Sequence, residues 1–477
     1  MTDSATRQFV DEVWQQSIVP TLCDYIRIPN KSPAFDPDWH ANGHMQRAVE
    51  LLRDWCDTLD IQGLSCEIHT LTDRTPVLLC EIPATRSDLG TVLLYGHYDK
   101  QPEFTGWEPG LSPWEPVLRD GKLYGRGGAD DGYALFGSLT AIAALQAQGK
   151  DHGRCVVLIE GCEESGSFDL PFYVTALRER IGQPGLVICL DAECGNYDQL
   201  WVTTSLRGML PGVLSVEILE QGQHSGAAGG IVPSSFRLLR SLLDRIEDAT
   251  TGTLHNSLYV DIPRSAKTQL AAVAEVLGTT VTTRFPWTPG AHPASDDLPE
   301  LLLNNAWRPS LATVGLGGAP QPADAGNTLR PGTQAKLVFR LPPTLDAEIA
   351  AATIKAELER DPPNGATVAF DLETPQTGWC APQVESWIAG ALEESSQRHF
   401  GKSAMYMGMG GTIPFMKMLG DSYPGVQFLV TGVLGPHSNA HGPNEFLEIS
   451  TGKRITACVA DVLAAHAKLP AAGTAKV

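Results

Sequence analysis

The 477-residue sequence predicts an α/β domain with a central mixed or parallel sheet, interrupted by a smaller α+β domain. Three short apolar runs are the first indication, because strands buried on both faces lack polar alternation. Helical patterns separate these runs, as expected for a sheet covered by helices on both faces. After about Arg207 the runs alternate between apolar and polar residues, which indicates a sheet with one solvated face. We therefore expect residues 1–207 and 380–477 to form the larger domain and residues 208–379 to form the insertion.

The larger domain begins with two predicted helices, one over about residues 5–30, closed by Pro29 and Asn30, and one over 45–59. An Ala/Leu-rich helix is expected later, over 132–148. The three predicted buried strands span 91–95, 155–159 and 186–190.

The insertion is expected to combine exposed-face strands, helices and loops. The strands are predicted at 212–219 and 335–341, the helices at 234–246 and 268–276, and Pro/Gly-rich loops around 284–299 and 317–332. The larger domain then resumes with a helix from about Pro382, a strand at 426–430 and a helix near 451–467. The tail, residues 471–477, is expected to fray.

The composition excludes several classes of protein. With 35 Lys and Arg against 55 Asp and Glu, the net charge of −20 argues against a nucleic-acid partner, since such binding depends on basic residues. The first 20 residues do not resemble a signal peptide, and no apolar run is long enough to span a membrane. The ten cysteines are scattered without a C-x-x-C pair, which predicts reduced thiols in a cytoplasmic protein.

Acidic residues and histidines follow all three predicted strands. The first strand runs into Gly96-His97-Tyr98-Asp99, the second is followed by Glu163-Glu164, and the third by Asp191. Because ligands bind beyond the carboxyl ends of parallel strands, we expect these side chains to meet at one edge of the sheet. Two further segments join them, the glycine-rich loop Gly125–Asp131 and the segment Pro436–Glu445.

Each motif alone has a simpler explanation. His97 and Asp99 could form a surface pair, Glu163-Glu164 a solvated turn, and Asp191 a helix cap. The glycine-rich loop could hold phosphate, but it lacks the required Lys-Ser/Thr signature and its two aspartates would repel an anion.

Together the motifs favour a metal site. Carboxylates gathered at one edge repel each other unless a cation neutralises them. Two imidazoles combined with carboxylates suit zinc, whereas an all-oxygen set suits magnesium or calcium. The inventory is large enough for two ions that share a bridging carboxylate.

The motifs resemble, in order and spacing, the co-catalytic zinc peptidase and deacylase family that includes carnosinase, nonspecific dipeptidase, aminoacylase, acetylornithine deacetylase and succinyl-diaminopimelate desuccinylase. The motifs are Gly96-His97-Tyr98-Asp99, Gly125-Arg126-Gly127 with Asp130-Asp131-Gly132, Glu163-Glu164-Ser165-Gly166-Ser167, Gln223-His224-Ser225-Gly226 and His441-x-x-Asn444-Glu445. The resemblance covers essentially the whole chain and is closest to the dipeptidase/carnosinase branch. It implies a zinc-peptidase catalytic domain interrupted by a dimerisation or lid domain, and a homodimer.

The resemblance also implies a metal-ligand set. His97 and Asp191 would bind one ion, His441 and Glu164 would bind the other, and Asp130 would bridge the two. Zinc is the expected metal, although manganese or cobalt would fit the same ligands. His437 lies four residues before His441, but the H-x-x-N-E pattern selects His441.

The same resemblance implies roles around the metals. Asp99 would orient the ring of His97. Glu163, pointing away from Glu164 on a segment taken as extended, would be the general base that takes a proton from the attacking water and passes it to the leaving amine. His224 would stabilise the oxyanion in the partner subunit's active site, and Arg340 would grip the substrate carboxylate. Further contacts to the substrate are implied for Thr328, Gly411 and Thr412.

Some positions depart from the family pattern or have a simpler explanation. Gly132 stands where many relatives carry Lys, Lys100 where an aliphatic residue is common, and Thr412 where Ser is frequent. None of these removes a metal ligand. Without the resemblance, His224 would be read as a solvated loop residue and Arg340 as part of a structural ion pair.

The sequence therefore predicts a dizinc hydrolase that cleaves an amide bond in a small substrate with a free carboxylate, and favours a dipeptide. An N-acyl-amino-acid deacylase or a carboxypeptidase is the alternative, since the metal chemistry would be the same. A catalytically silent metal-binding assembly protein is disfavoured because the base and every ligand are retained. No nucleic-acid or membrane partner is expected.

Overall fold

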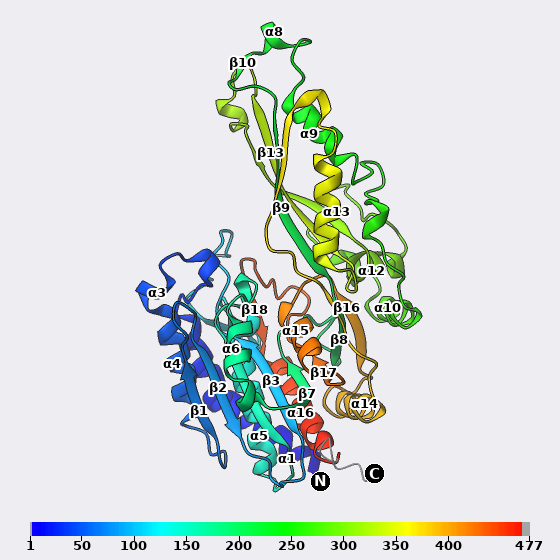
Figure 1. Cartoon of the computed structure of the whole chain (residues 1–477). Helices are drawn as coiled ribbons and strands as arrows, with labels where there is room; N and C mark the ends of the chain where they lie inside the picture. The colour runs from blue at the N-terminus through cyan, green and yellow to red at the C-terminus, as the bar shows by residue number, and fades with distance from the viewer. Residues whose placement is uncertain (1, 470–477) are drawn as a thin grey trace.

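The computed structural model describes residues 2–469 as a larger α/β part with a narrower part projecting from it (Figure 1). A six-stranded sheet with the order β1-β2-β6-β3-β7-β17 forms the centre of the larger part. Its strands are β1 (Ser65–His69), β2 (Val77–Ile82), β3 (Thr91–His97), β6 (Arg154–Glu160), β7 (Pro184–Cys189) and β17 (Gln427–Val430). Strands β6, β3, β7 and β17 are parallel, whereas β2 is antiparallel to both of its neighbours. The predicted α/β class with a central mixed sheet is confirmed.

Helices cover both faces of this sheet because alternate residues of each strand face opposite sides. Val92 and Leu94 of β3 pack in one hydrophobic cluster, and Leu93 and Tyr95 pack in the other. The first cluster includes the helices α1 (Thr2–Val13), α2 (Val19–Ile26), α4 (His44–Cys56), α5 (Ala134–Gln146), α14 (Ser386–Phe400) and α16 (Ile449–His466). The second includes α6 (Leu170–Ala176), α7 (Arg178–Ile181) and α15 (Pro414–Ser422). Short helix α3 spans Trp39–Asn42.

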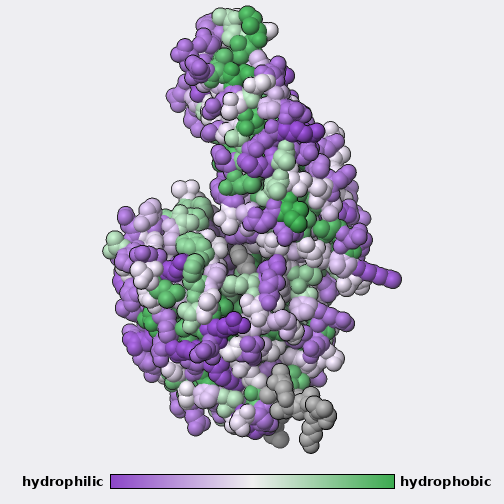
Figure 2. Space-filling model, in the orientation of Figure 1, coloured by the Kyte–Doolittle hydropathy of each residue, from purple (hydrophilic) through white to green (hydrophobic). Residues whose placement is uncertain are grey.

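The projecting part is built on a separate antiparallel sheet with the order β11-β13-β9-β14 (Figure 1). These strands are β9 (Gly208–Glu217), β11 (Ser310–Gly317), β13 (Gly332–Leu341) and β14 (Thr367–Leu372). Burial alternates along β13, and its buried residues pack against α9 (Ser235–Leu243) and α13 (Ala347–Glu359). The far tip carries β10 (Gln223–His224), β12 (Thr328–Leu329) and α8 (Ser225–Ala228). The space-filling view shows this part as a narrow extension of the larger body (Figure 2).

Two smaller sheets and three helices complete the arrangement. One three-stranded sheet contains β8 (Trp201–Leu206), β15 (Trp379–Cys380) and β16 (Met405–Met409), and another contains β4 (Val117–Arg119), β5 (Lys122–Tyr124) and β18 (Phe446–Glu448). Helices α10 (Arg264–Leu277), α11 (Thr280–Thr283) and α12 (Leu298–Ala306) belong to the insertion in sequence, yet α10 and α12 pack against β16 of the larger part. The boundaries at 207/208 and 379/380 stay a prediction.

The loops predicted around 284–299 and 317–332 are largely confirmed, with the start of α12, which Asp297 caps, and the two-residue strand β12 as the exceptions. One expectation is wrong. Cys66 and Cys80, opposite each other on β1 and β2, form a disulfide, so not all ten cysteines are reduced thiols. The cytoplasmic location stays a prediction. No helix within residues 2–469 is both long and apolar enough to cross a membrane. The predicted frayed tail lies outside the described residues.

Candidate active site

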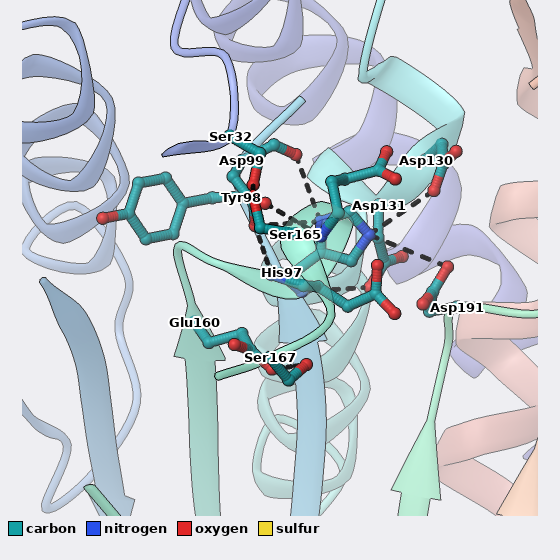
Figure 3. Close-up of polar contacts among 12 residues, drawn as sticks. Ser32, His97, Tyr98, Asp99, Asp130, Asp131, Glu160, Ser165, Ser167 and Asp191 are labelled. Carbon is teal, nitrogen blue, oxygen red and sulfur yellow. Dashed lines mark hydrogen bonds and ion pairs between the residues drawn. The ribbon is translucent and has the colours of Figure 1, made fainter. Parts of the chain in front are cut away.

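His97 lies at the carboxyl end of β3, in the middle of the central sheet, and is fully buried. Its Nε2 atom lies 3.4 Å from Oδ1 of Asp130 and 3.8 Å from Oδ1 of Asp191. Figure 3 shows both carboxylates approaching this side of the ring, with Asp99 on the other side. The parallel pairing of β3 with β6 and β7 brings these strand ends together, as predicted.

Asp130 reaches the site on the glycine-rich loop that precedes α5. Gly127 has a φ of 78°, and a Cβ there would lie 2.6 Å from the side chain of Lys100, so glycine allows the loop to pass close to this lysine. The second carboxylate oxygen of Asp130, Oδ2, lies 3.0 Å from Nε2 of His441. Asp130 therefore places one oxygen toward each histidine.

His441 comes from the segment that follows β17, and its Nε2 atom also lies 3.3 Å from Oε2 of Glu164. The ligand atoms form two sets within 4.8 Å, one of His97, Asp130 and Asp191 and one of Asp130, Glu164 and His441. Asp130 belongs to both, which is the arrangement of a bridging carboxylate. His437 lines the same cavity but contributes to neither set.

The donor atoms fit divalent cations. Nε2 of His97 and Oε1 of Glu164 are buried without a hydrogen-bond partner among residues 2–469. Buried polar atoms without a partner are expected where a bound metal ion is the missing partner. Each set combines one imidazole with two carboxylates, a combination that zinc accepts. Cys56, Cys66 and Cys80 form a further group that could hold a metal ion, but the sulfurs of Cys66 and Cys80 form the disulfide.

Electrostatics within the cluster support the same conclusion. Burial raises the pKa of Glu164 to about 8, and neighbouring Asp130 adds to this rise. Burial lowers the pKa of His441, but Glu164 and Asp130 outweigh burial and raise it to about 10. The crowded carboxylates thus favour positive charge between them, supplied by protons when no ion is bound.

Glu163 and Glu164 lie on a single 3-10 turn, Glu163–Ser165, and not on the extended segment that the sequence suggested. Asp99 fixes this turn, because its carboxylate accepts the main-chain N–H of Glu163 at 3.1 Å and that of Glu164 at 3.0 Å. The Nδ1 atom of His97 lies 3.1 Å from the main-chain oxygen of Asp99 and 3.4 Å from its carboxylate. Asp99 therefore positions the glutamates as well as the histidine.

A cavity of about 950 Å³ opens onto the cluster. Glu163, Asp130 and Asp191 line it, together with Gly411 and Thr412 from the segment after β16. Glu163 belongs to neither ligand set, and burial, followed by the charge of Asp191, raises its pKa well above the usual range. A carboxylate with a raised pKa beside a cavity is suited to proton transfer.

Arg340 lies on β13 and donates to Oγ1 of Thr412, a residue that lines this cavity, at 3.2 Å. Arg207, which the sequence did not single out, lies beside it and donates to main-chain oxygens and to Ser310. Burial lowers the pKa of Arg340, and burial followed by Arg340 lowers that of Arg207 to about 10. In the described part of the chain neither guanidinium meets a carboxylate, so the pair offers a site for an anion.

His224 and Thr328 lie at the far tip of the projecting part, where they face each other in the β10–β12 pair. Nδ1 of His224 accepts the N–H of Gly226 at 3.1 Å. The structure thus separates these two residues from the other predicted site residues of the same chain (Figure 1).

A buried ion pair joins the two loops that carry Asp130 and His441. Nη1 of Arg126 lies 2.5 Å from Oε2 of Glu445, and the other oxygen of Glu445 accepts the N–H of Gly127 at 2.9 Å. Nη2 of Arg126 also donates to the main-chain oxygen of Gly442 at 2.6 Å. Both residues stand within the quoted motifs, but only the structure reveals that they pair.

Comparison with known proteins agrees with this geometry. The profile of Peptidase family M20/M25/M40 matches residues 93–465. Cysteinylglycine-S-conjugate dipeptidase of Corynebacterium striatum is 26% identical over 463 residues, which cover 92% of this chain and 94% of the relative. Beta-Ala-His dipeptidase of Homo sapiens is 25% identical over 448 residues, covering 86% of this chain and 82% of the relative. The structure of the dipeptidase Dug1p from Saccharomyces cerevisiae has a TM-score of 0.80 at 21% identity and covers 98% of this chain and 100% of that chain.

Proposed function

Since the chain belongs to Peptidase family M20/M25/M40, we propose that it is a metal-dependent dipeptidase. The carrying observation is the placement of Asp130 between His97 and His441, beside a cavity lined by Thr412, to whose hydroxyl group Arg340 donates. A dication pair and an anion-binding site at the two sides of one cavity suit a small amide with a free carboxylate. The names of the curated relatives support the dipeptide as substrate.

Two zinc ions are proposed to occupy the two ligand sets. One would be held by His97, Asp130 and Asp191, and the other by Asp130, Glu164 and His441. When bound, the ions would polarise the scissile carbonyl and lower the pKa of a water.

Glu163 is proposed to be the general base. Its carboxylate would accept a proton from the attacking water and later donate it to the leaving amine, so that the proton is conserved over one turnover. Asp99 supports this role, because it fixes the turn that directs Glu163 into the cavity.

Arg340 is proposed to bind the substrate carboxylate, with Arg207 adding positive charge and Thr412 a hydroxyl group. Gly411 lines the cavity beside Thr412 and is proposed to contact the substrate main chain.

A homodimer is proposed to complete the site. His224 and Thr328 lie too far along the projecting part to join their own chain's metal cluster, so a second copy would have to receive them (Figure 1). Edge strand β11 supports this arrangement, because Val314 and Leu316 are exposed on it at 61% and 65%. His224 would then stabilise the oxyanion in the partner's site, and Thr328 would contact the substrate there.

The test is hydrolysis of a panel of dipeptides and N-acyl amino acids by protein stripped with a chelator and reloaded with zinc, manganese or cobalt. We expect dipeptide hydrolysis that disappears after chelation and returns with metal. Release of amino acids from N-acyl substrates only would establish the deacylase alternative. Activity that survives chelation would contradict the metal assignment.

A further inference from the structure

A second cavity of about 300 Å³ lies beside the active site, where α10 and α12 pack against β16. Apolar side chains line most of it, among them Leu270, Val273, Leu277, Leu302 and Met407. A volume of this size is at the lower end of small-ligand sites, so it suits one large side chain and not a whole dipeptide.

This apolar cavity adjoins the active-site cavity, and three side chains stand between the two. Glu193, Arg284 and Phe285 line both of them. Strand β16 forms a shared wall as well, since Met409 lines the active site and Met407 lines the apolar cavity. Glu193 follows the metal-site residue Asp191 by two positions, which places the mouth next to the reacting centre.

The mouth is closed by side chains that can move. Nη1 of Arg284 lies 3.7 Å from Oε2 of Glu193, and their side chains are 34% and 38% exposed. A partly exposed ion pair of this length contributes little to stability. Phe285 is 48% exposed, so its ring can shift without disturbing a packed core. A substrate side chain could therefore enter from the active site.

Charged side chains on the two sides of the active site would attract opposite ends of a dipeptide. Arg340 and Arg207 attract the carboxylate, whereas Glu193, which belongs to neither ligand set, attracts the ammonium group. The amino-terminal residue then lies at the mouth of the apolar cavity. Resting on the proposed dipeptidase function, we propose that this cavity binds the side chain of the amino-terminal residue and selects dipeptides that begin with a large apolar residue.

The interior explains why the side chain must be apolar. The wall formed by α10 and α12 is aliphatic except for Asn305, and burying a charged group against it without a charged partner would be unfavourable. A Leu side chain fills space that Ala leaves empty, and each methylene in such a pocket favours binding by roughly ten-fold or more.

The test measures binding by calorimetry in the zinc-loaded E163Q protein, which is expected to bind dipeptides without cleaving them. Leu-Gly is expected to bind at least ten-fold more tightly than Ala-Gly, and also more tightly than Gly-Leu. Adding L277W, which fills the cavity, is expected to reduce Leu-Gly affinity to that of Ala-Gly. The matched control is V276W, at a 44% exposed neighbouring position that does not line the cavity, and it should keep the preference.

A second variant, L277A, guards against misfolding of L277W and is expected to shift the preference toward Trp-Gly. Equal affinity for Leu-Gly and Ala-Gly, or a preference that survives L277W, would overturn the proposed cavity function. Failure of the proposed dipeptidase function differs from this, since the wild type would bind Leu-Gly without hydrolysing it. Absence of binding by every dipeptide would overturn both.

Discussion

At the scale of single residues, Glu163 and Glu164 share one turn but face different surroundings. Glu164 lies 3.3 Å from His441 and accepts a hydrogen bond from Gln101 at 2.6 Å, whereas Glu163 lines the cavity and joins neither ligand set. We therefore expect E163Q to lower kcat by about 10²- to 10⁴-fold, the usual contribution of a general base, while metal content stays at the wild-type level. Steady-state kinetics and elemental analysis of the same preparation test this.

The matched control is E164Q, which should lose metal because it replaces a ligand. Loss of metal in E163Q with retention in E164Q would show that the two roles are interchanged.

Arg340 allows a separate prediction about the substrate. Its guanidinium has no carboxylate partner in the described residues, so a substrate carboxylate would be the first carboxylate to pair with it. We expect R340M to raise KM for a dipeptide by at least ten-fold, since a charge-assisted hydrogen bond contributes roughly 1.5–3 kcal/mol. The corresponding dipeptide amide, which lacks the carboxylate, should be cleaved equally by wild type and R340M. An equal loss on both substrates would indicate a structural role instead.

At the scale of elements, the loop before α5 and the segment before β18 depend on each other. Arg126 and Glu445 are nearly fully buried, so removing one leaves the other charge without a partner. We expect R126M to lower the free energy of unfolding by about 3–5 kcal/mol. Denaturant unfolding of the apo protein measures this without interference from metal binding.

The double variant R126M/E445L is the control for this pair. It should recover part of the loss, because replacing both charges with apolar groups removes the unpaired carboxylate. No recovery would show that the arginine acts through its other contacts.

The buried strands of the central sheet, and the gathering of polar residues at their ends, were predictable because their signals are local. Continuous apolar runs predicted β3, β6 and β7, and His97, Glu164 and Asp191 stood out at or just beyond their ends. Their roles as metal ligands were implied by the family resemblance and not by these local signals. Strand β11 was not predicted, since Gly315 and Gly317 interrupt its apolar pattern and it lies at a sheet edge.

Contacts that depend on register or on distant segments could not be predicted. The Cys66–Cys80 disulfide requires that the two residues face each other on β1 and β2, which spacing does not reveal. Arg207 directly precedes the insertion and Arg340 lies within it, 133 residues later, and Arg284 belongs to a segment predicted as a loop. The apolar cavity therefore could not be predicted from the sequence, because it depends on the packing of α10 and α12 on β16.

At the scale of the whole molecule, the long projecting part separates His224 from the metal cluster of its own chain (Figure 1). A sheet-based projection with an exposed apolar edge is suited to isologous pairing, in which each chain offers the same surface to the other. Such a dimer would contain two sites, each with metal ligands from one chain and His224 from the other.

This arrangement predicts complementation between two inactive variants. H224A and E163Q should each have very low kcat, but a mixed dimer would contain one site with both defects and one with none. Random reassociation makes half of the dimers mixed, so about one quarter of wild-type activity should return. Activity is measured after unfolding and refolding the variants together, with separately refolded samples mixed as the control. If co-refolded samples are no more active than that control, His224 acts within its own chain or not at all, because a shared site is the only source of the recovered activity.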